Sequence, residues 1–196
     1  METKKLQGFA ICIDPGHGGR DPGAVDGKNA SENDTLLTAE KDVNLSVAKV
    51  LADKLRLQGA RVTLTRGSDW YPSLAQRCQI ANNFGASIFI SLHCNAGSAQ
   101  AAGIETLYNP DSKNGKRLAE LVQTELIVAT KAPSRGARPR SDLWVLNGTK
   151  MPAVLIEMGF VTNPGEEAKL NSNSYQAILA DAIVKAILRY KKGESV

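Results

Sequence analysis

Five short apolar runs alternate along the chain with segments in which apolar residues recur every three or four positions. The runs occupy residues 9–13, 62–64, 88–92, 104–107 and 153–156, and several show no alternation of apolar and polar residues. Such runs are typical of strands buried on both faces. Strands that alternate with helices predict an α/β fold, with a mostly parallel central sheet and helices on both faces in three layers.

The helical segments are expected around residues 43–55, 74–81, 118–126 and 178–187. We expect Thr38 to cap the first helix, because Glu40 and Asp42 follow in its opening turn, and Gly59 to end it. The polar stretch 24–37 is longer than most connections in a compact domain, which indicates a functional or a mobile loop.

The length of 196 residues is about that of one domain, enough to bury roughly 70% of the surface of the unfolded chain. We therefore expect a single domain over residues 1–196, with its core at about 9–190 and short polar tails. Its three cysteines, Cys12, Cys78 and Cys94, lack any C-x-x-C spacing, so we expect buried, reduced thiols.

The composition restricts the partners. The net charge of +4 is mild, and we expect neither nucleic-acid binding nor an obligate oligomer, but a monomer. No apolar run approaches the roughly 18–20 residues of a membrane helix, so membrane insertion is not expected either.

The two histidines stand in similar places. His17 follows the first apolar run after three residues, and His93 directly follows the run 88–92. Glu157 comes directly after the run 153–156, and Glu40 opens the helix behind the long loop. Because ligands bind beyond the carboxyl ends of parallel strands, we expect these four side chains to meet at one edge of the sheet.

Two imidazoles and one carboxylate are a ligand set of catalytic zinc, and a further glutamate would supply a general base. On spacing alone, hydrogen-bonded structural histidines explain the pattern almost as well. A phosphate-binding loop at 16–23 is disfavoured because no G-K-[ST] follows. A thiol nucleophile at Cys94 is disfavoured because adjacent strand residues point to opposite faces.

Several motifs, in a fixed order, resemble the zinc-dependent N-acetylmuramoyl-L-alanine amidases of the amidase-3 type. They cover the chain from about residue 10 to about 188. The motifs are IDPGHGGRDPGA at 13–24, EKDVNL at 40–45, TR at 65–66, SLHCNA at 91–96, GIET at 103–106, PAVLIEMGF at 152–160 and TNP at 162–164.

The resemblance implies that His17, Glu40 and His93 hold one Zn²⁺ and that Glu157 is catalytic. It also implies the substrate, peptidoglycan, and the bond, the amide between N-acetylmuramic acid and L-alanine. The chain departs from the family at Cys94, where relatives commonly carry alanine, and Glu32 is a competing candidate for the metal. We prefer Glu40, because its sequence context matches the family motif.

Two other functions stay open: a zinc peptidase of similar fold acting on free peptides, and a wall-binding module that has lost catalysis. The substrate implies action at the cell envelope, yet residues 1–13 do not resemble an export signal. We expect the catalytic domain of an exported enzyme, with a phage endolysin that waits in the host cytoplasm as the alternative.

Three further groups are of interest. The basic stretch at Arg135, Arg138, Arg140 and Lys150 is expected to be a solvated loop or, alternatively, a cleft edge that contacts carboxylates of the stem peptide or anions of the wall. Arg66 and Arg77 are expected to form structural ion pairs. The neighbouring aromatics at 70–71 are expected to pack, with a sugar-binding platform as the alternative.

Overall fold

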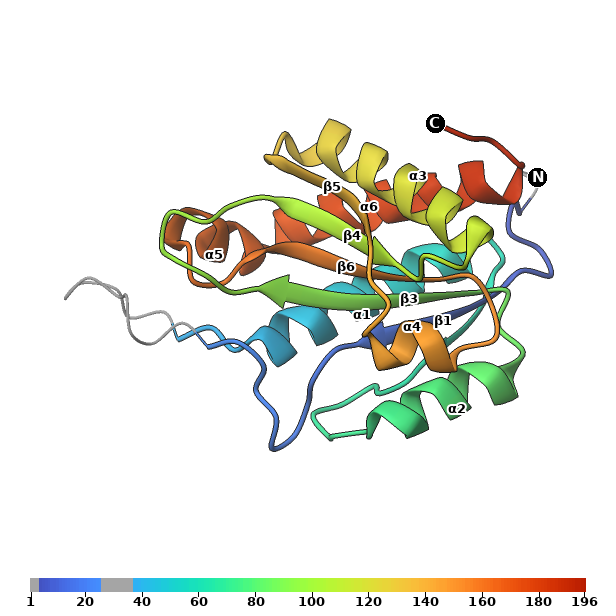
Figure 1. Ribbon diagram of the computed structural model, residues 1–196, viewed down its shortest axis with the longest axis horizontal. Coiled ribbons are helices and arrows are strands. Elements are labelled where there is room, and N and C mark those ends of the chain that lie inside the picture. The colour runs from blue at the N-terminus through green and yellow to red at the C-terminus, as the bar shows by residue number, and fades with distance from the viewer. Residues whose placement is uncertain (1–3, 26–36) are drawn as a thin grey trace.

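The computed structural model describes residues 4–25 and 37–196, and within them six strands form one sheet in the order β2-β1-β3-β6-β4-β5 (Figure 1). The strands are β1 (Ala10–Pro15), β2 (Arg61–Leu64), β3 (Ile88–Asn95), β4 (Ile104–Tyr108), β5 (Ser134–Pro139) and β6 (Ala153–Phe160). All neighbouring strands are parallel except β4 and β6, which are antiparallel. The predicted α/β fold with a mostly parallel sheet is confirmed.

Helices cover both faces of the sheet, as Figure 1 shows. The helices are α1 (Glu40–Leu57), α2 (Leu74–Phe84), α3 (Lys113–Thr130), α4 (Trp144–Gly148), α5 (Pro164–Leu170) and α6 (Asn173–Lys191). One apolar cluster lies between the sheet and α1, α3 and α6, and a second lies between the sheet and α2 and α4. None of the helices in the described ranges is long and apolar enough to cross a membrane.

Helix α1 packs along the sheet through apolar residues spaced four apart, Val43, Val47, Leu51 and Leu55, all of them buried. This spacing places them on one face of the helix. The same helix carries Glu40 in its first turn, so the packing of its apolar face fixes where that carboxylate lies.

The predicted cap of α1 is wrong. The N-cap is Ala39 rather than Thr38, and no side chain caps this helix. The free N–H groups of Glu40 and Lys41 instead donate to the carbonyl oxygens of Ala24 and Pro22, at 2.8 and 3.1 Å. The Thr38 hydroxyl accepts a hydrogen bond from Asn171. Backbone carbonyl groups that precede the helix by more than ten residues in the sequence thus satisfy the N–H groups that a capping side chain would otherwise bind.

Strand β5 corrects another expectation. The stretch that contains Arg135 and Arg138 is a strand at the edge of the sheet rather than a solvated loop (Figure 1). Its sequence, SRGARP, has low strand propensity, and Pro139 is tolerated because an edge strand leaves some N–H groups unpaired. Lys150 lies apart from it, beyond α4, next to the N-terminal end of β6.

The three cysteines are buried and reduced, as predicted. Burial raises the pKa of the Cys94 thiol well above its ordinary value, with the nearby carboxylates of Glu40 and Glu157 contributing. The Cys94 thiol packs against Asn44 on the α1 side of the sheet. It is therefore a structural residue and not a nucleophile.

Candidate active site and metal centre

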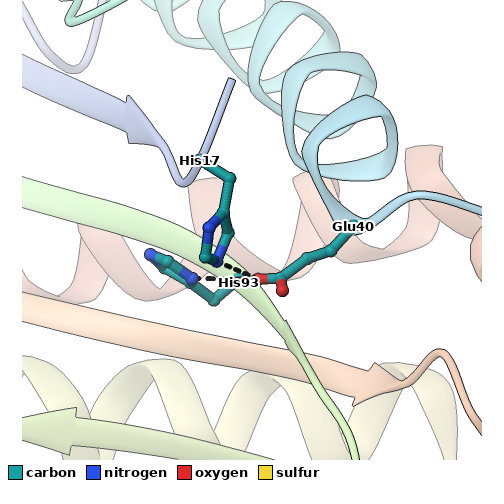
Figure 2. Close-up of side chains that lie close together, drawn as sticks. All are labelled: His17, Glu40 and His93. Carbon is teal, nitrogen blue, oxygen red and sulfur yellow. Dashed lines mark hydrogen bonds and ion pairs between the residues drawn. The ribbon is translucent and has the colours of Figure 1, made fainter. Parts of the chain in front are cut away.

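The structure brings His17, Glu40 and His93 together at the carboxyl ends of β1 and β3 (Figure 2). His17 lies on the loop after β1, His93 lies near the end of β3, and Glu40 begins α1. One ligand atom from each residue lies within 4.8 Å of the other two. The rings of His17 and His93 meet edge to face, with their centroids 4.9 Å apart.

Both imidazoles point at the same carboxylate oxygen. Oε1 of Glu40 lies 3.2 Å from Nε2 of His17 and 2.9 Å from Nδ1 of His93. The other oxygen of Glu40, Oε2, accepts a hydrogen bond from the backbone N–H of Ala24. Glu40 is almost fully buried, whereas about a fifth to a quarter of each histidine side chain is exposed. The cluster is therefore closed on the protein side and accessible from the solvent side.

The electrostatics of the cluster favour a cation at its centre. Burial by itself raises the pKa of Glu40, but hydrogen bonds and charge from the two histidines hold that pKa well below its ordinary value. Burial also lowers the pKa of His17, but Glu40 and Asp21 outweigh it and raise that pKa to about 9. An ionised carboxylate shared by two imidazoles is a site where a divalent cation can replace bound protons.

Asp21 orients His17. Its Oδ2 lies 2.9 Å from Nδ1 of His17, which leaves Nε2 directed at Glu40. A carboxylate on the outer nitrogen is the usual partner of a metal-ligating histidine, because it fixes the tautomer and the ring orientation. This role of Asp21 was not predicted from the sequence, although Asp21 stands in the same motif four residues after His17.

The loop that carries His17 has a strained backbone conformation, and two buried arginines hold that backbone in place. His17 has a φ of 59°, in the left-handed region that side chains other than glycine seldom adopt. Two buried guanidinium groups bind the carbonyl oxygens of the loop: Arg66 those of residues 15 and 16, and Arg77 those of residues 15 and 17. Arg77 also forms an ion pair of 2.7 Å with Asp14.

The ion-pair prediction is thus confirmed for Arg77. Arg66, by contrast, donates to backbone carbonyl oxygens only, among the described residues. The two arginines are structural, but what they stabilise is the backbone that presents a ligand.

Two glycines are required next to the cluster. A Cβ on Gly16 would lie 2.3 Å from Cε1 of His93, and a Cβ on Gly23 would lie 2.5 Å from Oε2 of Glu40. Gly23 also has a φ of +69°. Gly16 and Gly23 therefore let the backbone approach the candidate ligands closely.

Glu157 lies on β6, directly opposite His93 in the sheet register. Its Oε2 is buried and has no hydrogen-bond partner among the described residues. Burial is the main cause that raises the pKa of Glu157 from 4.5 to about 7; His93 opposes the shift, and the charges of Glu40 and Glu105 add to it. A carboxyl group with a pKa near 7 can both accept and donate a proton at neutral pH.

A pocket of about 250 Å³ opens beside the cluster. His17 and His93 form one wall, and Tyr71 from the loop before α2 and Trp144 from α4 form others. Trp144 is 60% exposed. Of the two neighbouring aromatics singled out in the sequence, Tyr71 lines this pocket, whereas Trp70 is not among its lining residues.

Among the residues expected at the site, His17, Glu40, His93 and Glu157 all lie at this one edge of the sheet. The competing candidate Glu32 lies outside the described residues. Three of the expected residues, His17, Glu40 and His93, surround one point with ligand atoms that could hold a metal ion.

Residues 11–189 match the N-acetylmuramoyl-L-alanine amidase family Amidase_3. The chain belongs to this family. It is a hydrolase of the peptidoglycan amidase class, which acts in remodelling of the cell wall.

Individual relatives are similar to this chain over most of their length. The chain is 36% identical to the germination-specific N-acetylmuramoyl-L-alanine amidase of Bacillus subtilis, over 96% of this chain and 83% of that protein. It is 38% identical to the uncharacterized protein YqiI of the same organism, over 96% and 87% of the two chains. The crystal structure of an N-acetylmuramoyl-L-alanine amidase from Clostridium difficile 630 superposes with a TM-score of 0.86 and 39% identity, covering 95% of this chain and 98% of that one.

Proposed function

We propose that this protein hydrolyses the amide bond between N-acetylmuramic acid and L-alanine in peptidoglycan with the help of one zinc ion held by His17, Glu40 and His93. The convergence of two imidazoles on one buried, ionised carboxylate carries the proposal. The donor set fits zinc, because two nitrogens and one oxygen with an accessible side are the ligands of catalytic zinc sites.

Zinc bound there would supply a Lewis acid that polarises the scissile carbonyl and makes hydroxide available at neutral pH. The residues of the chain provide the rest. Asp21 holds the imidazole of His17 in place, and Arg66 and Arg77 hold its backbone. Burial of the two guanidinium groups keeps this backbone in one geometry before substrate arrives.

Glu157 is proposed as the general base and acid. Its Oε2, which has no hydrogen-bond partner in the part of the chain that the structure describes, would accept a proton from the attacking water and then pass it to the nitrogen of the departing alanine. Without that transfer the amine is a poor leaving group. The raised pKa of Glu157 suits both halves of the transfer, because neither protonation state is strongly favoured near pH 7.

The proposed substrate places the protein at the cell envelope. We further propose that it acts as a monomer and that residues 1–196 make up one catalytic domain, with its core at about 9–190, with peptidoglycan as the partner and no nucleic acid. Light scattering of the purified protein tests the monomer.

The central experiment is digestion of purified sacculi, with mass spectrometry of the products and metal analysis of the same protein. We expect stem peptides with a free N-terminal alanine, and one zinc per chain. Glu157→Gln should lower kcat by about 10²- to 10⁴-fold while keeping the zinc. His93→Ala should lose both zinc and activity, and Glu120→Gln, on the exposed side of α3, serves as the matched control.

Other outcomes would contradict the proposal. New reducing sugar without new amine would indicate cleavage of the glycan strand. Activity on short peptides but not on sacculi would indicate the peptidase alternative, and zinc binding without any turnover would indicate the binding module. Unchanged turnover in Glu157→Gln would refute the assigned base. Removal of the metal by a chelator should abolish hydrolysis, and added Zn²⁺ should restore it.

A further inference from the structure

Strand β5 continues the active-site face of the sheet away from the histidines. The register pairs His93 with Glu157, and Glu157 with Glu105 on β4. Along β4 and β5, the register pairs Leu107 with Arg138. Leu107 packs in the cluster under α2 and α4, so Arg138 stands on the same face as Glu105 and Glu157.

Three guanidinium groups and two carboxylates occupy this outer part of the face. Arg135 and Arg138 approach Glu105 with their Nε atoms at 3.8 and 3.7 Å, which is too long for a hydrogen bond. Arg140 forms a two-point pair with Asp142, at 2.7 Å for both contacts. The five groups therefore carry a net charge of +1 beside Glu157.

Arg135 and Arg138 differ in how many of their N–H groups are accessible to a ligand. The Arg135 guanidinium lies over the ring of Phe160, with its carbon 5.1 Å from the ring centroid, and its Nε is buried. The Arg138 side chain is 59% exposed, and its Nε donates to the carbonyl oxygen of Arg135. The two terminal nitrogens of Arg138 make no hydrogen bond within residues 4–25 and 37–196. They form an open, planar donor pair.

We propose that Arg138, with Arg140 beside it, binds a carboxylate of the peptide part of the substrate while the scissile amide lies next to Glu157. This inference rests on the proposed function, since it assigns the direction in which the substrate lies across the site. Guanidinium groups bind carboxylates through two parallel hydrogen bonds, which a neutral amide cannot reproduce.

The distances fit a stem peptide. Strands β6, β4 and β5 are neighbours, and the register places Arg138 level with Leu155, two residues from Glu157 on β6, so the backbones at Glu157 and Arg138 lie about 12 Å apart. An extended peptide spans about 3.3–3.6 Å per residue. The carboxylate that reaches Arg138 therefore belongs to roughly the third residue from the scissile bond. The pocket lined by the two histidines, Tyr71 and Trp144 leaves room for the sugar.

The test compares soluble muramoyl peptides prepared from sacculi with the same peptides after their carboxyl groups have been converted to amides. The wild-type protein should show a kcat/KM about tenfold higher for the free carboxylates. In Arg138→Gln the ratio of the two kcat/KM values should fall to about one, mainly through KM. Arg138→Lys, which keeps the charge but not the planar donor pair, should retain part of the preference.

Arg56→Gln is the matched control, because Arg56 is a half-exposed arginine in the last turn of α1 and its replacement removes the same charge. It should keep the full tenfold preference. A second measurement needs no turnover: titration of each variant with the released peptide, with free or amidated carboxyl groups, should show the same loss of discrimination in Kd for Arg138→Gln. Circular dichroism and thermal unfolding verify that each variant is folded.

An equal preference for both substrates in the wild type would overturn the proposal, and so would a preference that survives Arg138→Gln. If Arg56→Gln also lost the preference, the preference would come from the net charge of the protein and not from Arg138 on β5, which would overturn the proposal as well. Failure of the proposed function has a different signature: the wild type would then cleave neither form, while the titration would still report on the carboxylate site.

Discussion

Glu157→Gln should make the protein more stable at neutral pH while it removes activity. The pKa of Glu157 in the folded protein is raised from 4.5 to about 7, mainly because the carboxyl group is buried. Ionising Glu157 at neutral pH therefore costs more free energy in the folded protein than in the unfolded chain. The difference between the two pKa values corresponds to about 3 kcal/mol of unfolding free energy.

The sign follows from the order of the two pKa values. Below pH 4.5 the carboxyl group is protonated in both states and has no effect. Between pH 4.5 and 7 the unfolded chain releases the proton while the folded protein keeps it, so the free energy of unfolding falls as the pH rises. Above pH 7 the whole loss is present. Glutamine has no such titration, so Glu157→Gln should gain about 3 kcal/mol over wild type between pH 4 and pH 8.

The assay is urea unfolding of wild type and variant from pH 4 to pH 8, in EDTA so that no metal ion contributes. For a chain of this length, 3 kcal/mol also corresponds to a rise in Tm of about 6–12 °C at pH 8. Glu120→Gln, which replaces an exposed carboxylate of α3, is the control for the substitution itself. A constant difference between Glu157→Gln and wild type would refute the argument that burial keeps this carboxyl group protonated.

Three further predictions concern the residues around the site. Arg77→Met leaves the buried carboxylate of Asp14 without its cation, so we expect a loss of about 3–5 kcal/mol of unfolding free energy, measured with urea; a loss below 1 kcal/mol would contradict this. Gly16→Ala would place a Cβ against the His93 ring and should weaken zinc binding at least tenfold by competition with a chelating dye, while Gly67→Ala, where a Cβ meets nothing within 4 Å, should not. The three buried thiols should not react with a thiol reagent until the protein is unfolded, and rapid reaction of native protein would contradict their burial.

The sequence predicts the parts of this fold whose apolar pattern is strong. Strand β3 is the clearest case, since residues 88–92 are buried in the sheet and the run ends directly before a histidine. The periodic segments became α1, α2, α3 and α6. In each of them local pattern and tertiary packing agree, because the same apolar residues that favour the element also form the core.

The weaker elements could not be predicted in this way. Strand β5 has arginines and a glycine where strands normally carry branched residues, and it exists because β4 offers it a partner. Helix α4 has five residues, too few for a periodic pattern. Thr38 has the side chain of a helix cap, but the backbone of residues 22–24 occupies that place.

At the site, the types of residue and their order determine that two imidazoles and two carboxylates are available at strand ends and at a helix start. Only the folded chain decides that both imidazoles meet one oxygen of Glu40, that Asp21 holds the far side of His17, and that Glu157 is buried without a hydrogen-bond partner among the described residues. Chemical identity is a property of each residue alone. Proximity, burial and the resulting pKa values depend on which distant segments the sheet places side by side, and no local pattern contains that information.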